Sequence, residues 1–280
     1  MGREIVSAKI DVVFKELFIR KEELLKNFIS DVLDIPFENI LKIVLTNPEI
    51  PSDFSDGKLV KLDLSLSLRQ QDGSETLINV ELQVNRQSYF KKRTMFYWAK
   101  LYTSELQSGE SYSKLKKTIC INILDFNITD KKEYHTEIIA SDKATGEQFT
   151  DLMSIHFFEL RKVSDRLDVN DKKGMWMHLI KADTEEELNM IKSTNISAME
   201  QAVQVILDMN ADTALRERAR LREKALHDET SDMQGAREEG LKEGIEKGIE
   251  KGIEKERSAI IEKMRKSGMT DEQITMILNQ

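Results

Sequence analysis

Two consecutive runs of alternating apolar and polar residues constrain the fold of this chain more than any other feature. The runs are Leu59–Leu68 and Leu77–Val84, and in both an apolar residue stands at every second position. Successive side chains of a strand point to opposite faces, so each run predicts a half-buried strand with one apolar face. Asp72 and Gly73 form a strong turn signal between the runs. The two strands are therefore expected to form an antiparallel hairpin.

The same pattern predicts the register of the hairpin. A two-residue loop would set Asp63 opposite Leu82 and leave Asp63 and Glu81 on opposite faces. A three- or five-residue loop instead sets Asp63 opposite Glu81. It also sets Ser65 opposite Asn79. Because both apolar faces must pack on one core, the second register is expected.

In this register Asp63 and Glu81 share the polar face of the hairpin. Directly opposed residues of antiparallel strands have Cβ atoms about 5 Å apart. Two carboxylates this close repel each other unless a positive charge lies between them, and a hard divalent cation held by carboxylates and water meets that need. The alternative is a surface hairpin whose outer face is polar and whose two acids are simply solvated.

Further elements follow from the periodicity on either side of the hairpin. Two short amphipathic helices are expected in the first forty residues. A helix is expected at Phe90–Gln107, with Met95, Trp98, Ala99, Tyr102 and Leu106 on one apolar side. A buried strand is expected at Thr118–Phe126, followed by strands at Tyr134–Ala140 and Met153–Leu160. This order indicates an α/β sandwich with a mixed sheet flanked by helices.

The C-terminal part of the chain is predicted to be helical. Three helices are expected after Val163, then a charged helix at Ala214–Glu229. From Gly240 a Gly-Leu-Lys-Glu unit precedes three Gly-Ile-Glu-Lys units, and Ser258–Gln280 resembles two short helices broken at Ser267 and Gly268. The expected divisions are a core at 1–163, a helical region at 164–235, a repeat helix at 236–257 and a short helical pair at 258–280.

The glycine repeat predicts self-association. Each glycine inside a helix costs about 1 kcal/mol relative to alanine, yet the repeat keeps glycine and an aliphatic residue in phase over four units. Close approach of a second helix would offset that cost, so a homodimer or higher homo-oligomer is expected. The alternative is a flexible linker.

Composition indicates an ordered protein of a reducing compartment. Apolar residues make up 40% of the 280 residues and only three are proline, which is typical of a globular chain. The single cysteine, Cys120, excludes an internal disulfide framework. No apolar run approaches the roughly 20 residues that span a bilayer, and the N-terminus lacks the apolar stretch of a signal peptide. A cytoplasmic location without membrane attachment is expected.

The charge is unevenly distributed. The net charge of −8 disfavours wrapping of long nucleic acid. The segment from Val84 to Lys117, however, holds eight basic residues against Glu105 and Glu110, a local charge of +6. Two further classes of site find no support: the four histidines are scattered without zinc-ligand spacing, and no phosphate-binding G-x-x-x-x-G-K-[ST] loop occurs.

Several segments, taken in order, resemble one known family. They are Asp11–Phe18, Lys61–Asp63, Asn79–Gln83, Lys92–Trp98, Leu101–Tyr102 and Ile121–Phe126, together with the tandem glycine repeat. In this combination the chain resembles the recombination-promoting nuclease/transposase family of the PD-(D/E)XK nuclease superfamily. The resemblance covers nearly the whole chain.

The resemblance implies a fold and an activity. The fold would be a PD-(D/E)XK restriction-endonuclease-like core with a mixed central sheet flanked by helices, and a helical C-terminal region. The activity would be Mg²⁺-dependent endonuclease cleavage of phosphodiester bonds in DNA, associated with recombination or mobile elements. Asp63 matches the metal-binding aspartate and Glu81 the second acid, while Gln83 stands where the superfamily usually has lysine. Glutamine cannot supply positive charge but can orient the attacking water.

Two more sets of residues are candidates. Asp11 and Lys15 lie one helical turn apart; Asp11 is a candidate helix-borne acid of the site, or the two form a surface ion pair. Arg93 and Tyr97 are likewise one turn apart, and with Lys91 and Lys92 they are candidates for nucleic-acid binding. The alternative is a buried tyrosine beside solvated lysines.

A rival function belongs to another class. The chain could be a catalytically decayed protein that self-associates and binds nucleic acid or other partners.

Overall fold

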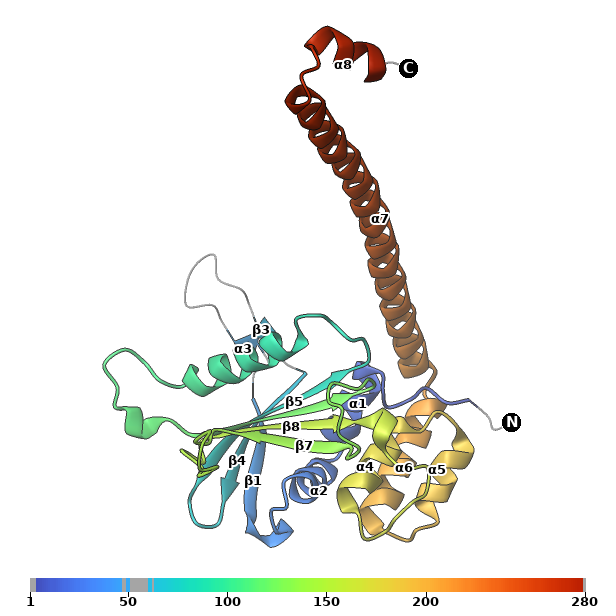
Figure 1. Ribbon diagram of the computed structural model, residues 1–280. Coiled ribbons are helices and arrows are strands. Elements are labelled where there is room, and N and C mark those ends of the chain that lie inside the picture. The colour runs from blue at the N-terminus through green and yellow to red at the C-terminus, as the bar shows by residue number, and fades with distance from the viewer. Residues whose placement is uncertain (1–3, 47–48, 51–59, 62, 279–280) are drawn as a thin grey trace. The chain divides into compact units, whose positions relative to one another are not determined.

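The computed structural model describes residues 4–46, 49–50, 60–61 and 63–278, and its centre is a mixed six-stranded sheet (Figure 1). The strand order is β1-β4-β5-β6-β8-β7. The bounds are β1 Ile40–Leu45, β4 Leu64–Gln70, β5 Glu75–Gln83, β6 Lys117–Leu124, β7 His135–Ile139 and β8 Met153–Glu159. Strands β5, β6 and β8 are parallel, and the outer pairs are antiparallel. The predicted mixed sheet flanked by helices is confirmed.

The predicted hairpin register is confirmed in the pairing of β4 with β5. Ser65 lies opposite Asn79 and Leu64 opposite Val80. Gly73 adopts a positive φ of 85° at the turn, a conformation that glycine reaches without steric cost. The first predicted strand is interrupted, however: β3 (Val60–Lys61) pairs with β2 (Glu49–Ile50) in a separate sheet. Two residues of the predicted run, Leu59 and Leu62, lie outside the described residues.

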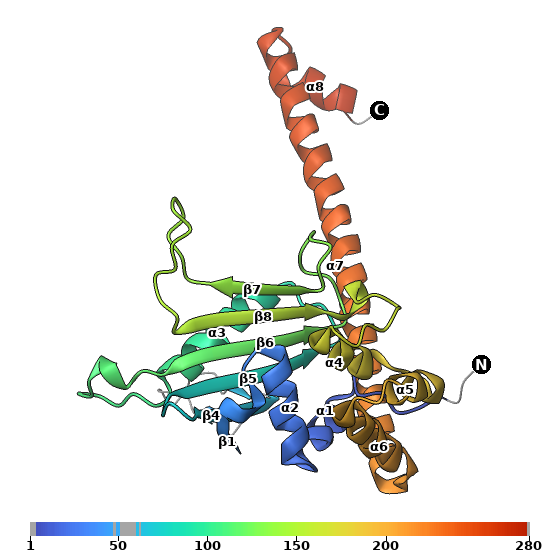
Figure 2. The same cartoon turned by 90° about the horizontal axis from the view of Figure 1, so that it is seen from below.

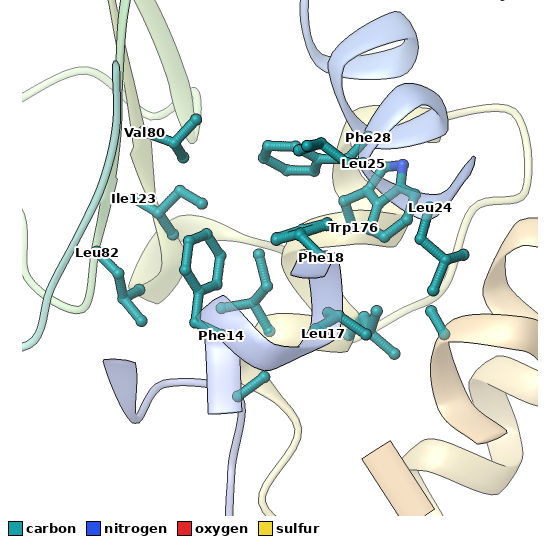
Figure 3. Packing of buried hydrophobic residues seen from close by; sticks show 14 of the residues in the cluster. Phe14, Leu17, Phe18, Leu24, Leu25, Phe28, Val80, Leu82, Ile123 and Trp176 are labelled. Atoms are coloured by element: carbon teal, nitrogen blue, oxygen red, sulfur yellow. The ribbon is translucent and has the colours of Figure 1, made fainter. Parts of the chain in front are cut away.

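The apolar face of the sheet and five helices from both ends of the core share one cluster of buried apolar residues. These helices are α1 Asp11–Ile19, α2 Glu22–Val32, α4 Lys172–Lys181, α5 Glu185–Lys192 and α6 Ser197–Ala211. Figure 3 shows Phe14 facing Ile123 of the sheet, with Phe18, Phe28 and Trp176 packed together behind it, and all of these side chains are buried. The indole of Trp176 also donates a hydrogen bond to Asp31 at 2.9 Å. This cluster fixes α1 against the sheet.

The opposite face of the sheet is covered by α3 (Phe90–Thr103), as Figure 2 shows. Asn79 and Glu81 on this face are therefore buried, and seven consecutive residues of β5, Thr76–Leu82, are buried. The predicted half-buried strand is thus wrong for β5, and so is the alternative of a solvated polar face. Alternation predicted two chemically different faces, but a helix from elsewhere in the chain buried the polar one.

The side that α3 turns to the sheet also differs from the prediction. Phe90, Thr94 and Leu101 are buried, whereas Met95 is 46% exposed. Trp98 is half-buried and its indole nitrogen donates to the carbonyl of Thr118 at 3.0 Å. The apolar residues of α3 can be grouped into more than one helical face. Packing against the sheet buried the face of Phe90, Thr94 and Leu101, which the sequence did not single out.

Strand β1 was not predicted. Its six residues, Ile40–Leu45, bury only Ile40 and Ile43, so the segment shows no period-two alternation. Short 3₁₀ turns occur at Phe37–Asn39, Tyr112–Lys114 and Leu160–Lys162. The predicted strand pair β7–β8 and the three helices after Val163 are confirmed.

The chain divides into two compact units, Met1–Glu223 and Lys224–Gln280. Helix α7 spans Thr213–Lys266 and includes the whole glycine repeat, so the predicted helical state of the repeat is confirmed. Helix α8 is Asp271–Leu278, and the predicted break before it is confirmed. Thr270 and Gln273 cap α8 through reciprocal side-chain to backbone hydrogen bonds. No helix of the described chain is long and apolar enough to cross a membrane.

Candidate active site

The hairpin brings Asp63 and Glu81 together. Asp63 lies one residue before β4, and its backbone N–H donates to Glu81 Oε1 at 3.2 Å. The carboxylate of Asp63 in turn accepts from the backbone N–H of Leu82 at 3.1 Å. These reciprocal bonds follow from the register, which sets the two residues across from each other. Each carboxylate thus accepts a backbone hydrogen bond from the strand or strand end opposite.

Glu81 is buried in an environment that disfavours its charge. Its residue is 5% exposed, and burial, with a further contribution from the charge of Asp63, raises its pKa to about 7. Hydrogen bonds from the Asp63 backbone and the Asn79 side chain act in the opposite direction. The acids are therefore not simply solvated, and an ionised Glu81 needs a positive charge nearby.

Lys15 on α1 supplies one positive charge. Its Nζ lies 3.1 Å from Oδ1 of Asp63, and both side chains are largely buried. Asp11, one turn earlier, points elsewhere and pairs with Arg222 of α7 at 3.2 Å. The predicted alternatives for Asp11, a third acid of the site or an ion pair with Lys15, do not describe this arrangement. The two residues share a face of α1 but lie one turn apart along it, and the turn that carries Lys15 is the one beside Asp63.

Gln83 extends the site along β5. Its Nε2 donates to Oε2 of Glu81 at 3.3 Å, so this neutral amide holds the buried carboxylate. Asn79, two residues before Glu81 on the same face, was not singled out from the sequence. Its Oδ1 is buried and accepts no hydrogen bond from the described residues. The signal for it was its place in the alternation, Asn79-Glu81-Gln83.

Helix α3 brings a cation and an aromatic ring to the same neighbourhood. Arg93 donates to Gln87 at 2.5 Å and lies 5.7 Å from the centre of the Tyr97 ring. Its charge lowers the pKa of Glu81, against the larger effect of burial. Lys91 and Lys92 are exposed on the same helix.

Part of the basic stretch between Val84 and Lys117 is neutralised. Lys116 pairs with Glu75 at 2.9 Å and also with Glu105. Lys114 pairs with Glu110 at 2.5 Å. The positive charge that remains for a ligand is therefore concentrated at the start of α3 rather than spread over the whole segment.

The donor set fits a divalent cation that keeps some of its water. Among the described residues, no group of three or more His, Cys, Asp or Glu side chains could hold a metal. Mg²⁺, however, is commonly bound through one or two carboxylates, with water and substrate phosphate completing its coordination. Two adjacent carboxylates, one of them buried with a raised pKa, provide such a partial set.

Comparison with known proteins agrees with this geometry. The model of a family described as PD-(D/E)XK nuclease family transposase matches residues 8–236. No curated protein and no solved structure matches the chain. The match includes the hairpin, α1, α3 and the sheet, which are the elements that build the site. The chain therefore belongs to the PD-(D/E)XK nuclease family transposases, and this membership indicates a nuclease or transposase-like role.

Proposed function

We propose that the protein is a divalent-cation-dependent DNA endonuclease that uses Mg²⁺ and acts in recombination or in the movement of mobile elements. The observation that carries this proposal is the contact between Asp63 and buried Glu81, whose pKa is raised to about 7. A carboxylate in that state is costly for the fold unless a cation binds it. A buried carboxyl with a perturbed pKa beside a charged partner is typical of functional sites.

Asp63 and Glu81 would hold the cation, which when bound lowers the pKa of water and stabilises charge on the phosphoryl oxygens. Gln83 would orient the attacking water through its side-chain oxygen, because its nitrogen is engaged with Glu81. Lys15 would provide the positive charge that a glutamine at position 83 lacks. Arg93 would contact a phosphate, and Lys91 and Lys92 would attract the DNA backbone.

Asp11 would act as a positioning residue. Its ion pair with Arg222 ties the first turn of α1 to α7, and the same helix carries Lys15 one turn later. Asp11 would thus orient Lys15 and have no contact with the substrate.

The direct test is relaxation of supercoiled plasmid DNA by the purified protein in Mg²⁺ and in EDTA. Cleavage in Mg²⁺ alone is the expected result. No cleavage with any divalent cation would favour the rival function, a decayed nuclease that self-associates.

For Lys15 we expect Lys15→Met to lower the cleavage rate about 100-fold, the size typical for removing one group that stabilises the transition state. Lys15→Arg keeps the charge and should retain most activity. Affinity for Mn²⁺, measured by calorimetry without DNA, should not fall in Lys15→Met, because Lys15 and the cation both approach Asp63. Full activity of Lys15→Met would remove Lys15 from the mechanism.

The glycine repeat is proposed to hold two copies of the chain together. Leu241, Ile245, Ile249 and Ile253 are all more than half exposed along α7. A Cβ atom built on any of the four repeat glycines meets nothing within 4 Å among the described residues. A second copy of this helix would cover the aliphatic residues, and the glycines would let the two backbones approach closely.

The dimer is tested by comparing the full chain with a chain that ends at Gln234. Light scattering over a concentration series should show dimers of the full chain and monomers of the shortened one. If both are monomers at the same concentrations, the repeat is not an association helix. Association that survives the truncation would place the interface within residues 4–234.

A further inference from the structure

Aromatic side chains gather on the first half of α3, the helix that covers the polar face of β5, and just before it. Tyr89 precedes the helix and is 54% exposed, and Phe96 is 40% exposed. Tyr97 is half-buried, with its ring centre 6.4 Å from that of Phe96. We call Tyr89, Phe96 and Tyr97 the aromatic rim.

The aromatic rim belongs to the neighbourhood of Asp63 and Glu81. Burial raises the pKa of the Tyr97 hydroxyl, the charge of Arg93 lowers it, and the charges of Glu81 and Asp63 raise it further. Tyr89 acts on the same hydroxyl. Arg93, which stacks over the Tyr97 ring, also acts on Glu81. Tyr97 and Arg93 therefore link the rim to the helix that covers Glu81.

Helical spacing places cations between these rings. Lys92 and Phe96 are four residues apart and lie on one side of α3, about 100° around the helix from the side that carries Arg93 and Tyr97. Arg86, Lys91 and Lys92 are exposed, and none of them pairs with an acidic side chain in the part of the chain that the structure describes. The exposed rings of the rim, Tyr89 and Phe96, thus stand among exposed positive charges.

Single exposed apolar residues are common and carry little information. Rings that stand among cations are different, because a hydrophobic protein partner would be opposed by the lysines. Single-stranded nucleic acid suits both groups: its phosphates meet the cations, and its unpaired bases stack on the rings. In an intact duplex the base faces are covered by neighbouring bases, so the rings would have no flat partner.

We propose that the aromatic rim stacks on unpaired bases, so that the protein binds a single-stranded segment of nucleic acid more tightly than an intact duplex. This inference rests on the proposed function for the place of the cleaved phosphate. Binding through the rim does not itself need cleavage, and the two can fail separately.

The test measures affinity by fluorescence anisotropy in EDTA, with a labelled 20-nucleotide DNA strand, the matching blunt duplex and an RNA strand of the same sequence. Wild-type protein should bind the DNA strand more tightly than the duplex. Phe96→Ala should weaken single-strand binding about 10-fold, which is within the range for one base–aromatic stack. The same variant should change duplex binding less than about twofold.

Three matched variants separate stacking from other effects. Phe96→Trp should restore single-strand binding, whereas Phe96→Leu, which keeps apolar bulk without a flat ring, should not. Met95→Ala removes another exposed apolar side chain of α3 and should change neither affinity. An equal loss on RNA would identify the base as the contact, and a loss on DNA alone would assign the site to DNA.

The proposal is overturned if Phe96→Ala leaves single-strand affinity unchanged or weakens strand and duplex equally. Either result can occur with cation-dependent cleavage intact, so it would not disturb the endonuclease proposal. Conversely, the protein could prefer single strands in a way that depends on Phe96 and yet cut no DNA. That result would support the stacking proposal and contradict the endonuclease proposal.

Discussion

Asp63→Asn should lower the rate of Mg²⁺-dependent plasmid cleavage by about 1,000-fold or more. The change removes the charge of one of the two carboxylates that would hold the cation, and a catalytic metal contributes several kcal/mol of transition-state stabilisation. Asparagine keeps the shape of the side chain and can accept from Leu82 as the carboxylate does. The loss should therefore be chemical, with an unchanged circular dichroism spectrum and melting temperature within a few degrees.

Two comparisons give this prediction its specificity. Gln83→Ala should leave weak residual activity, because it removes a group that orients water but keeps both carboxylates. Glu147→Gln, in the exposed loop between β7 and β8, removes a distant carboxylate and should cut as well as the wild type. Undiminished cleavage by Asp63→Asn would show that the active centre lies elsewhere.

Glu81→Gln should make the protein more stable at pH 8 but not at pH 4. Glu81 has a folded-state pKa of about 7 against an ordinary value of 4.5. Between these values the unfolded chain releases the proton while the folded chain keeps it, so the free energy of unfolding falls as the pH rises. Above pH 7 the accumulated loss is about 3 kcal/mol. Glutamine has no proton to lose, so the variant should lack this slope.

Divalent cations should reduce the difference in stability between the wild type and Glu81→Gln at pH 8. A cation beside Glu81 favours its ionised form, so Mg²⁺ at pH 8 should raise the unfolding free energy of the wild type more than that of Glu81→Gln. Urea unfolding at pH 4, 6 and 8, with and without Mg²⁺, measures both effects. If the unfolding free energies of wild type and Glu81→Gln change with pH in parallel, the pKa of Glu81 is not raised in the folded state. Glu147→Gln serves as the exposed control.

Much of the candidate site could be predicted from the hairpin. The alternation in Leu59–Leu68 and Leu77–Val84 determined which residues share a face, and only one register buries both apolar faces. The contact between Asp63 and Glu81 is the consequence of that register. The register of a hairpin can be predicted from the sequence because strand period and loop length depend on residues that are neighbours along the chain.

The environment of the carboxylates could not be predicted in the same way. Their burial depends on α3, and the choice between Lys15 and Asp11 depends on which turn of α1 the core shared with α2 and α4 places beside the hairpin. Neither the burial of the carboxylates nor the placement of α1 is determined by a single segment of the chain. Strand β1 escaped prediction for a related reason, since it pairs at the edge of the sheet and buries only two side chains.

The sequence by itself determined the strand pattern, the helices, the glycine repeat and the residue types of the candidate site. Those features follow from periodicity and turn chemistry, which act over a few residues. The tertiary structure alone decided that Glu81 is buried, that Lys15 pairs with Asp63, and that Asp11 pairs with Arg222. Those contacts join residues up to 211 positions apart, and they arise because close packing of the whole core selects one orientation for each helix.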